Sequence, residues 1–377
     1  MRRVRLKEIG TFYSGLSGKS KSDFSEGNAL LVTYRNIFNN PVLNPAIKDT
    51  VVVGKDEKQN EVLWGDILIT GSSETPADAG MSSVVLFNPQ EKMYLNSFCF
   101  GFRLNDMNEA LPSYIGHLLR STSIRAAISK TAFGVTRFNV NRMRFADIEI
   151  PLPPLNIQKE IVSILDSFTS LIDKMKQEVE MRKKQMEYYR EKLMAPQKNW
   201  EIKTLGEIGT FTRGNGLQKS DFRVKGFPCV HYGQIHTYYN TCIYKTKSFC
   251  EEDLAKKLQK ASYGDLLIAT TSEDVKACCK AAVWFGAGDV AYSGDSFCYS
   301  HDQDPKYMAY LFQTEMFAKQ KQKAATGAKV IRVSGESMAS FSFAFPPLVQ
   351  QRQIASILDT FETYISKLEK MIELRQK

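Results

Sequence analysis

The sequence predicts an α+β protein in which two similar domains of mixed helix and strand alternate with two long helices. Three observations lead to this prediction. Segments of the first half return in the same order in the second half, two long stretches carry a heptad pattern of apolar residues, and short apolar runs precede each stretch. With 377 residues and 43% hydrophobic content, the chain is long enough for two or three domains that each have a core.

Four segments of the sequence occur twice. The pairs are residues 6–12 with 205–211, 21–24 with 219–222, 65–70 with 264–269, and 153–166 with 346–359. Four matches in the same order indicate that a whole domain and the helical segment after it have been duplicated in tandem. We place the domains at residues 1–150 and 198–345, and the helical segments at residues 151–197 and 346–377.

Each helical segment carries apolar side chains at alternating steps of four and three residues, as in the seam of a coiled coil. The predicted seam consists of Ile161, Leu165, Phe168, Ile172, Met175 and Val179 in the first segment and Ile354, Leu358, Phe361, Ile365, Leu368 and Ile372 in the second. Arg182 and Arg375 interrupt the two seams at matching positions. Because a long helix with one apolar stripe is poorly stable alone, we expect the two helices to pair within one chain. Pairing between two copies of the chain is the alternative.

The domains before the helices are expected to mix strands and helices. Short apolar runs at 51–53, 67–69 and 84–87 lie between turn residues, as strands do. Residues 111–130 and their counterpart 305–323 are expected to be helical. The order of the strands does not follow from the sequence.

Motifs of common catalytic and metal sites are absent from the sequence. There is no phosphate-binding GxxxxGK[ST] loop, no GxSxG, and no Asn/Asp-Pro-Pro-aromatic motif of the kind that DNA amino-methyltransferases need. The seven cysteines form no CxxC pair and the four histidines do not cluster, so we expect reduced thiols, no metal and no cofactor. The start does not resemble a signal peptide, and no run of about 18 apolar residues occurs, which favours a cytoplasmic protein without a membrane span.

Polar, basic loops that contain glycine lie at matching places in both halves. They are residues 14–21 and 213–219, 33–36 and 231–234, and 130–139 and 323–332. Lysine and arginine neutralise phosphate, and arginine, asparagine and glutamine can pair with base edges. Together with the net charge of +9, the loops predict a protein that binds double-stranded DNA without modifying it. For any single loop, an ordinary turn with solvated lysines is the alternative.

Eleven residues of these loops are the predicted DNA-binding residues. We expect phosphate contacts from Lys19, Lys21, Lys219 and Lys329, base or groove contacts from Arg35, Arg137, Gln234 and Arg332, and further DNA contacts from Thr136, Arg213 and Tyr232.

The stretch PLPPLNIQKEIV at 151–162, its second copy at 346–355 and the two Gly-Asp-aliphatic-Leu-Ile motifs resemble the specificity subunit of type I restriction-modification systems. The resemblance covers essentially the whole chain. It implies two target recognition domains, each for one half of a bipartite DNA site, separated by two helices that form an antiparallel coiled coil and set the spacing. It also implies two methyltransferase subunits and further restriction subunits as partners, which carry the catalysis.

Two other hypotheses remain open. A coiled-coil adaptor that binds other proteins agrees equally well with the heptad pattern but does not explain the basic loops. An enzyme that acts on DNA is opposed by the missing motifs. The second helical segment has no counterpart of Met186, Tyr189 and Leu193 before the sequence stops at Lys377, which leaves the second seam shorter than the first.

Overall fold

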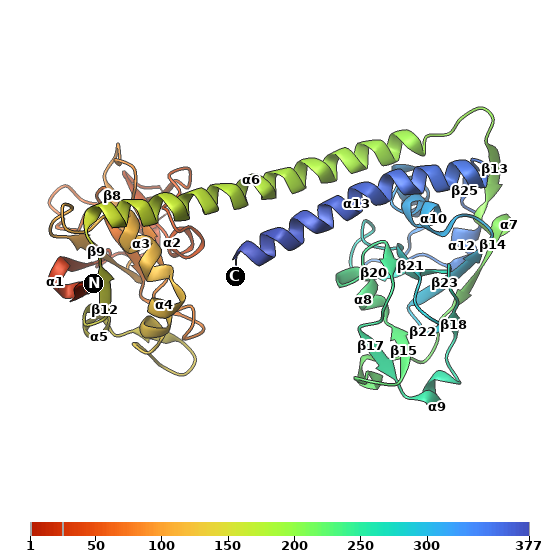
Figure 1. Ribbon diagram of the computed structural model, residues 1–377, viewed down its shortest axis with the longest axis horizontal. Coiled ribbons are helices and arrows are strands. Elements are labelled where there is room, and N and C mark those ends of the chain that lie inside the picture. The colour runs from red at the N-terminus through yellow and green to blue at the C-terminus, as the bar shows by residue number, and fades with distance from the viewer. Residues whose placement is uncertain (1, 25, 377) are drawn as a thin grey trace. The chain divides into compact units, whose positions relative to one another are not determined.

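The computed structural model describes residues 2–24 and 26–376 and divides into two compact units, Met1–Leu171 and Ile172–Lys377. Each unit contains one domain of mixed helix and strand (Figure 1). The division falls within one long helix, α6 (Leu155–Leu193), which starts in the first unit and continues into the second.

The first unit is built around an antiparallel sheet in the order β2-β9-β5-β7, accompanied by three smaller sheets, β4-β3-β8, β10-β11-β6 and β1-β12. Its strands are β1 (Arg2–Arg5), β2 (Gly10–Ser14), β3 (Ala29–Val32), β4 (Asp49–Val51), β5 (Ile67–Thr70), β6 (Ser72–Ser73), β7 (Ser82–Val84), β8 (Met93–Leu95), β9 (Cys99–Leu104), β10 (Ala132–Phe133), β11 (Phe138–Val140) and β12 (Glu149–Leu152). Its helices before α6 are α1 (Leu6–Ile9), η1 (Lys21–Phe24), α2 (Tyr34–Asn39), α3 (Pro112–Arg120), α4 (Thr122–Ser129) and α5 (Arg142–Ala146).

The second unit repeats this architecture. Its strands are β13 (Glu201–Thr204), β14 (Gly209–Arg213), β15 (Phe227–Val230), β16 (Cys242–Ile243), β17 (Ser248–Cys250), β18 (Lys260–Ala261), β19 (Leu266–Ala269), β20 (Thr271–Ser272), β21 (Lys280–Trp284), β22 (Val290–Tyr292), β23 (Ser296–His301), β24 (Ile331–Arg332) and β25 (Ser342–Phe345). Its helices after α6 are α7 (Leu205–Ile208), η2 (Lys219–Asp221), α8 (Tyr232–Thr237), α9 (Glu252–Ala255), α10 (Pro305–Leu311), α11 (Glu315–Ala324), α12 (Gly335–Ala339) and α13 (Leu348–Gln376).

The strand order shows that the two domains are copies of one design. The sheet β14-β23-β19-β21-β16 of the second domain repeats the order β2-β9-β5-β7 of the first and adds one strand. In both domains a second sheet pairs one strand in parallel, β3 with β8 and β15 with β22. The predicted fold class, two similar mixed domains with two long helices, is therefore confirmed.

The repeated LxEIGTF motif forms a one-turn helix that leads into the edge strand of each main sheet. In the second domain Leu205 and Ile208 are buried in the core. The hydroxyl of Thr204 accepts a hydrogen bond from the Glu207 amide at 3.3 Å, and the Glu207 carboxylate accepts one from the Thr204 amide at 2.6 Å. This reciprocal cap satisfies amides at the start of the helix, which explains the glutamate of the motif.

The repeated Gly-Asp motif forms the turn that starts the central strands β5 and β19. Asp66 is fully buried and accepts a hydrogen bond from the Leu63 amide at 2.8 Å, and Asp265 accepts one from the Ser262 amide at the same distance. In the first domain Arg103 also donates two hydrogen bonds to Asp66, at 2.8 and 2.7 Å. A buried carboxylate needs such partners, because charge removed from water must be compensated.

The two long helices pack against each other in the second unit. Met175 and Val179 of α6 form a buried cluster with Ile365 and Leu368 of α13. Figure 1 shows α13, in blue, running beside the C-terminal part of α6, and the two helices are antiparallel.

Contacts along the two helices define the antiparallel register. The Tyr189 ring stacks on Phe361 with centroids 5.6 Å apart, near the end of α6 and in the middle of α13. At the other end of the contact, Arg375 donates a hydrogen bond to the Met175 sulfur at 2.8 Å. Arg182, predicted to interrupt the seam, lies between these ends with its guanidinium over the Tyr364 ring at 5.4 Å. The antiparallel coiled coil implied by the resemblance is thus confirmed for this stretch of the helices.

Parts of the predicted seam serve other purposes. Ile161 packs against the core of the first domain, and Ile354 and Leu358 are buried in the core of the second. Leu165 and Phe168 are 38% and 55% exposed, and their assignment to the seam stays a prediction. A heptad pattern predicts an apolar stripe but not what covers it. The buried contacts with α13 include Met175, further along α6, and Ile372 of α13 packs against the same cluster. Ile172, one turn before Met175, is half-buried.

Candidate nucleic-acid interface

The first pair of predicted loops packs closely against the turn between β8 and β9 in the first domain and the turn between β22 and β23 in the second. The Gly15 amide donates a hydrogen bond to the Cys99 carbonyl, and the Gly214 amide donates one to the Ser296 carbonyl. A Cβ atom at Gly15 would lie 2.1 Å from the Asn96 carbonyl oxygen. Only glycine allows this approach, so the first glycine of each loop has a structural role.

The second pair of predicted loops forms the start of a short helix. Thr33 and His231 are the residues before α2 and α8, so Arg35 and Tyr232 belong to first helical turns rather than to loops. Arg35 is exposed. Tyr232 is half-buried, with its ring 4.5 Å from the His231 ring and its amide bonded to the Ser293 hydroxyl at 2.9 Å. Burial, together with Lys219 nearby, lowers the pKa of His231 and keeps it neutral.

The third pair of predicted loops forms hairpins that project from the domains. In the first domain β10 pairs with β11, and β11 pairs with β6. In the second, β24 pairs with β20, and Thr326 and Arg332 exchange two backbone hydrogen bonds of 2.9 Å. Gly134 and Gly327 start the two tips with φ of +130° and +103°. A side chain at either glycine would meet a carbonyl oxygen across the tip at 2.1 Å.

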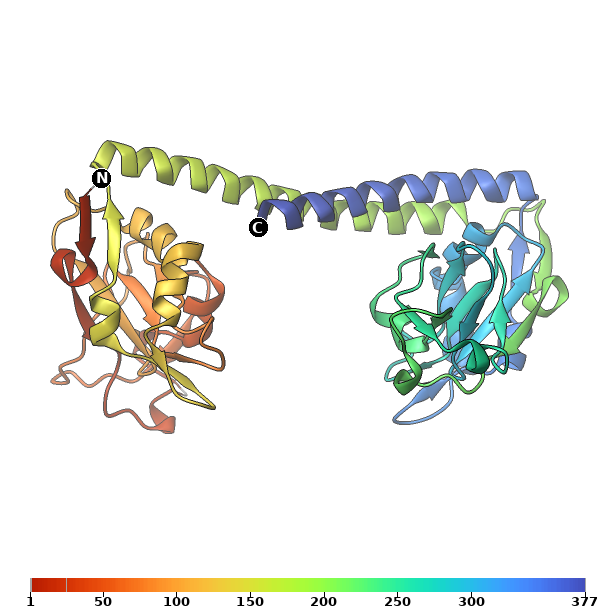
Figure 2. The ribbon, with the colours of Figure 1, turned by 60° about the horizontal axis from the view of Figure 1, so that its bottom comes forward.

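Within each domain these loops gather at one end. Figure 2 shows the hairpin of residues 132–140 and the segment around η1 at the end of the first domain away from the start of α6. In the second domain the hairpin around β24 and the segment around η2 lie at the end away from α13 (Figure 2). The scaffold therefore presents the hairpin and the segment that contains η1 or η2 at a common end of each domain.

A shallow pocket of about 470 Å³ brings two loops of the second domain together. It is lined by residues 213–218 of the first loop, His231 and Tyr232 of the second, and the turn of residues 293–295. Arg213 is exposed there and donates a hydrogen bond to the Gly294 carbonyl at 3.1 Å.

The hairpin of the second domain connects to the same pocket through Asp295. Its carboxylate accepts a hydrogen bond from the hydroxyl of Thr271 at 3.3 Å, and Thr271 pairs with Arg332 in the β20–β24 ladder. Arg332 and the tip residue Lys329 are exposed. The predicted residues Arg213 and Tyr232 thus line one concave surface, and Arg332 lies on the strand β24 that pairs with Thr271 beside it.

In the first domain an exposed aromatic ring connects the hairpin to the neighbouring turn. The guanidinium of Arg137 lies 5.2 Å above the Phe98 ring and donates a hydrogen bond to the Ser72 hydroxyl at 3.1 Å. Thr136 is exposed beside it at the tip. Arg142 donates to the Ser14 hydroxyl at 2.8 Å, which attaches the start of α5 to the first loop.

Two predicted contact residues are engaged within the protein. The Lys19 side chain is 9% exposed and forms an ion pair of 2.5 Å with Glu57, whose pKa it lowers to about 2. Gln234 is half-buried, and its amide donates to the Ser248 hydroxyl at 2.7 Å and accepts from the His231 amide at 3.1 Å. Either side chain would have to give up these bonds before it could contact DNA. Lys21 and Lys219, by contrast, are exposed.

The sequence interpretation missed the turns between β8 and β9 and between β22 and β23. Phe98 and Asp295 occupy equivalent places there, because the backbone carbonyl of each accepts a hydrogen bond from the residue after the central strand, Gly71 or Thr270. The sequence signal that could have located these turns is the short interval between two apolar strands, residues 96–98 and 293–295.

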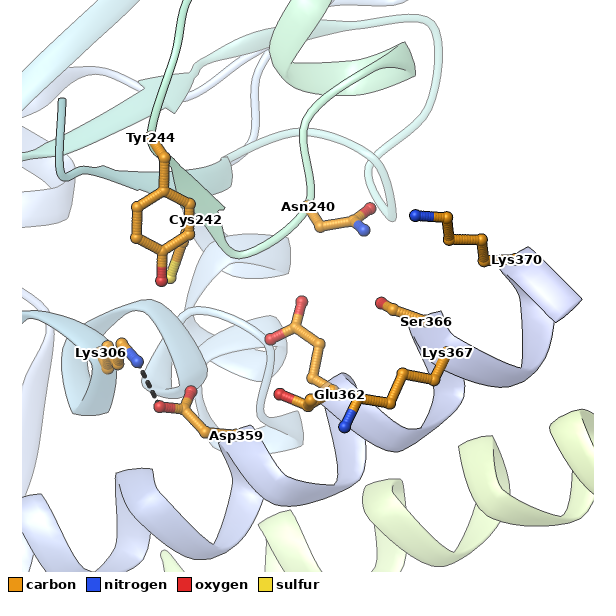
Figure 3. A pocket seen from close by; sticks show the side chains of 10 residues that line it. Asn240, Cys242, Tyr244, Lys306, Asp359, Glu362, Ser366, Lys367 and Lys370 are labelled. Carbon is orange, nitrogen blue, oxygen red and sulfur yellow. Dashed lines mark hydrogen bonds and ion pairs between the residues drawn. The ribbon is translucent and has the colours of Figure 1, made fainter.

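A second pocket, of about 400 Å³, lies beside α13 and away from these loops (Figure 3). Asp359 on α13 pairs with Lys306 and accepts a hydrogen bond from the Tyr310 hydroxyl at 2.8 Å. The same hydroxyl lies 2.9 Å from Glu362. These contacts connect α13 to α10, so the polar side chains that line the pocket have a structural role.

Across residues 2–24 and 26–376, no group of three or more histidine, cysteine, aspartate or glutamate side chains is placed to hold a metal ion. In the same part of the chain, no helix is both long and apolar enough to span a membrane. The seven cysteines are unpaired, and all but the half-buried Cys242 are buried, as expected for thiols that pack as small apolar groups.

These features define a class of protein: a tandem pair of mixed domains, each with an exposed loop surface that carries cations, joined to antiparallel helices. Residues 1–181 and 197–376 each match the family described as type I restriction modification DNA specificity domain. The chain belongs to this family.

Related proteins are type I restriction enzyme specificity subunits. The chain is 28% identical over 253 residues to a putative type I restriction enzyme specificity subunit of Haemophilus influenzae, covering 64% of this chain and 63% of that protein. It is 26% identical over 242 residues to the specificity subunit of the type I restriction enzyme EcoR124I/EcoR124II of Escherichia coli, covering 61% and 60%. The matches thus span less than two thirds of the length of these relatives.

Solved structures share the fold. The type I S subunit of M. genitalium covers 100% of this chain with a TM-score of 0.52 and 14% identity, over 92% of its own length. A second structure comes from work on complex assembly and conformational transition of the type I restriction-modification system. Its alignment covers 100% of this chain and 93% of that chain, with a TM-score of 0.63 and 15% identity. At this level of identity the likeness supports the fold alone.

Proposed function

We propose that the chain is the DNA-recognition subunit of a type I restriction-modification complex. Each domain binds one half of a bipartite DNA site, and the antiparallel helices set the spacing between the halves. Methylation and cleavage belong to partner proteins, two methyltransferase subunits and further restriction subunits, which the chain directs to the site. The chain itself contributes no catalytic group.

One observation carries this proposal: the same scaffold presents loops at the same end of both domains, while the exposed side chains on those loops differ. Phosphate-binding cations such as Lys21 and Lys219 recur at matching positions. The tips differ, with Thr136 and Arg137 in one domain and Lys329 and Val330 in the other. Shared phosphate contacts with different base contacts suit two domains that recognise different half-sites.

Salt-dependent binding tests the DNA contact. Neutralising Lys21, Lys219 and Lys329 to glutamine should make the dependence of log K on log salt concentration less steep by about 0.9 for each lost phosphate contact. The matched control neutralises the exposed lysines Lys174, Lys184 and Lys198. An equal change in both variants would refute the assignment of the loops to the interface.

Sequence-dependent methylation tests the role in the complex. The chain alone should leave DNA unmodified, and addition of its methyltransferase subunits should give methylation at one bipartite sequence. Sequence-dependent methylation by the methyltransferase without the chain, or none with both, would contradict the proposal.

A protein-binding adaptor is the second candidate, favoured by the exposed apolar residues Leu165, Phe168 and Leu171 on α6. Exposed apolar side chains close together on one helix are typical of a surface that contacts another protein. If the chain acts only as an adaptor, neutralising Lys19, Lys21, Arg137, Lys219, Lys329 and Arg332 should leave capture of its protein partner intact and affect nothing else.

A further inference from the structure

Three positions on the loop surface of the first domain carry exposed apolar side chains. In the first domain Phe98 is 58%, Phe133 57% and Val135 92% exposed. Large apolar side chains gathered on one exposed surface normally mark a contact with another molecule, since leaving them in water is unfavourable.

The positions of the second domain that are equivalent to these three carry small or polar residues, while Val330, at the position of Arg137, is 41% exposed. The offset of 193 pairs Phe133 with Thr326 and Val135 with Ala328, and the matching hairpin glycines, Gly134 and Gly327, support this alignment. Phe98 corresponds to an aspartate, since the carbonyls of both residues accept the amide after the central strand. The scaffold therefore does not require apolar groups at these positions.

The Phe98 ring is held in place, and exposed cations lie on the segments next to the hairpin, together with the exposed Glu74 after β6. The Phe98 amide donates to the Asn96 side chain at 2.9 Å, its carbonyl accepts from Gly71 at 2.8 Å, and Arg137 covers its ring. Lys130 and Arg144 are exposed on the segments around the hairpin. Cations around an apolar centre suit a polyanion that presents apolar groups between its phosphates.

Duplex DNA has one such apolar group in the major groove, the C5-methyl of thymine. A two-stranded ribbon such as β10–β11 has a shape that the major groove accepts, and apolar side chains contact thymine methyls there. Building on the proposed function, we propose that the first domain recognises its half-site through thymine methyl groups contacted by Phe98, Phe133 and Val135. The equivalent positions of the second domain, Thr326, Ala328 and Asp295, do not supply the same contacts.

The experiment uses the complex of the full chain with its methyltransferase subunits and the duplex whose sequence that complex methylates. Thymines are replaced by deoxyuridine, which lacks only the methyl group, in one half-site at a time. Loss of each contacted methyl should raise the Kd about fourfold, as expected for a buried methyl-sized group. Replacement in the other half-site should change the Kd less than twofold.

Variants assign the effect to the hairpin. Val135→Ala should remove the part of the deoxyuridine effect that depends on Val135, and because the side chain is almost fully exposed, the change cannot disturb the core. Phe98→Ala is the second variant. Val349→Ala, the same change at a 66% exposed position at the start of α13, should keep the full effect.

The proposal is overturned if deoxyuridine lowers the DNA affinity equally in both half-sites or in neither. It is also overturned if the half-site bound by the first domain contains no thymine. Undiminished sensitivity to deoxyuridine in both Val135→Ala and Phe98→Ala would overturn it as well. Loss of methyltransferase capture with unchanged DNA affinity would assign the apolar surface to a protein partner instead. If no duplex is bound or methylated in a sequence-dependent way by the unmodified complex, it is the proposed function that fails.

Discussion

Gln158 and Gln351 make the same two hydrogen bonds at the starts of α6 and α13. Each side-chain oxygen accepts a bond from the amide of the residue before a helix, Leu111 before α3 and Asp304 before α10, at 2.9 and 3.0 Å. Each side-chain nitrogen donates to a proline carbonyl at 2.8 Å. Both glutamines are buried, so they hold each long helix against the domain before it.

Removal of this side chain should destabilise the attachment of the helix. Gln351→Ala leaves a buried amide and a buried carbonyl without partners, and we expect a loss of about 2–3 kcal/mol in the free energy of unfolding. Urea unfolding measures it. The control is Gln353→Ala, the same substitution at an exposed residue two positions further along α13. It should change the free energy of unfolding by less than about 0.5 kcal/mol. Equal effects would show that the buried hydrogen bonds contribute little.

The coiled coil should depend on residues of α13 more than on the exposed stripe of α6. Leu368 is buried between the helices, and Leu368→Ala should cost about 2–4 kcal/mol through the lost apolar contacts and the cavity. Phe168→Ala, at a 55% exposed site, should cost less than about 1 kcal/mol in the isolated chain. A similar cost for both substitutions would mean that Phe168 is also packed.

The stability of the second domain should fall in mild acid because of His301. Burial lowers the pKa of this histidine, although Asp265, Asp302 and Asp304 oppose the shift, and its Nδ1 accepts a hydrogen bond from the Gln303 amide at 3.2 Å. A lowered pKa means that the folded state favours the neutral ring. The contribution is therefore present above the ordinary pKa of 6.5 and lost as pH falls below it.

Chemical unfolding at pH 7.5 and pH 5.5 measures this dependence. His301→Asn keeps an acceptor for the Gln303 amide without the titration, so its stability should change less between the two pH values than that of the unaltered chain. His231, whose pKa burial also lowers, should leave a residual dependence. An unchanged pH dependence in the variant would rule out His301 as a source.

Lys19 and Lys219 should differ in their effect on DNA binding although both were predicted to contact phosphate. Lys219 is exposed, whereas Lys19 is paired with Glu57. Lys219→Gln should reduce the steepness of the salt dependence by about 0.9, and Lys19→Gln should reduce it by less. Filter binding or fluorescence anisotropy across salt concentrations gives both slopes. A larger change in Lys19→Gln would show that its ion pair opens on DNA.

The duplication, the two long helices and their pairing were predictable because they leave long-range patterns in the sequence. The strand order was not, because the strands have two to six residues and several are buried on both faces, as in β5 and β19. Short buried strands carry no alternation that fixes their neighbours. The exposure of Leu165 and Phe168 was not predictable either, because a heptad pattern in the sequence does not show whether another helix covers the apolar side chains.

The candidate site was predictable as loops but not as individual roles. Residue type could not distinguish the exposed Lys219 from Lys19, which folding brings to Glu57, 38 positions away. Gln234 has the amide expected of a base-contacting residue, but that amide bonds to Ser248 and His231. Phe98 was missed because a single phenylalanine in a sequence usually belongs to a core.

The central claim is that each domain specifies one half of a bipartite DNA site. Methylome sequencing of cells that express the chain with its methyltransferase subunits tests it most directly, with Arg137→Ala and Arg332→Ala as variants. We predict one bipartite methylated motif that disappears without the chain, and relaxation of a different half of the motif in each variant. A continuous motif, a motif that persists without the chain, or relaxation of the same half by both variants would contradict the claim.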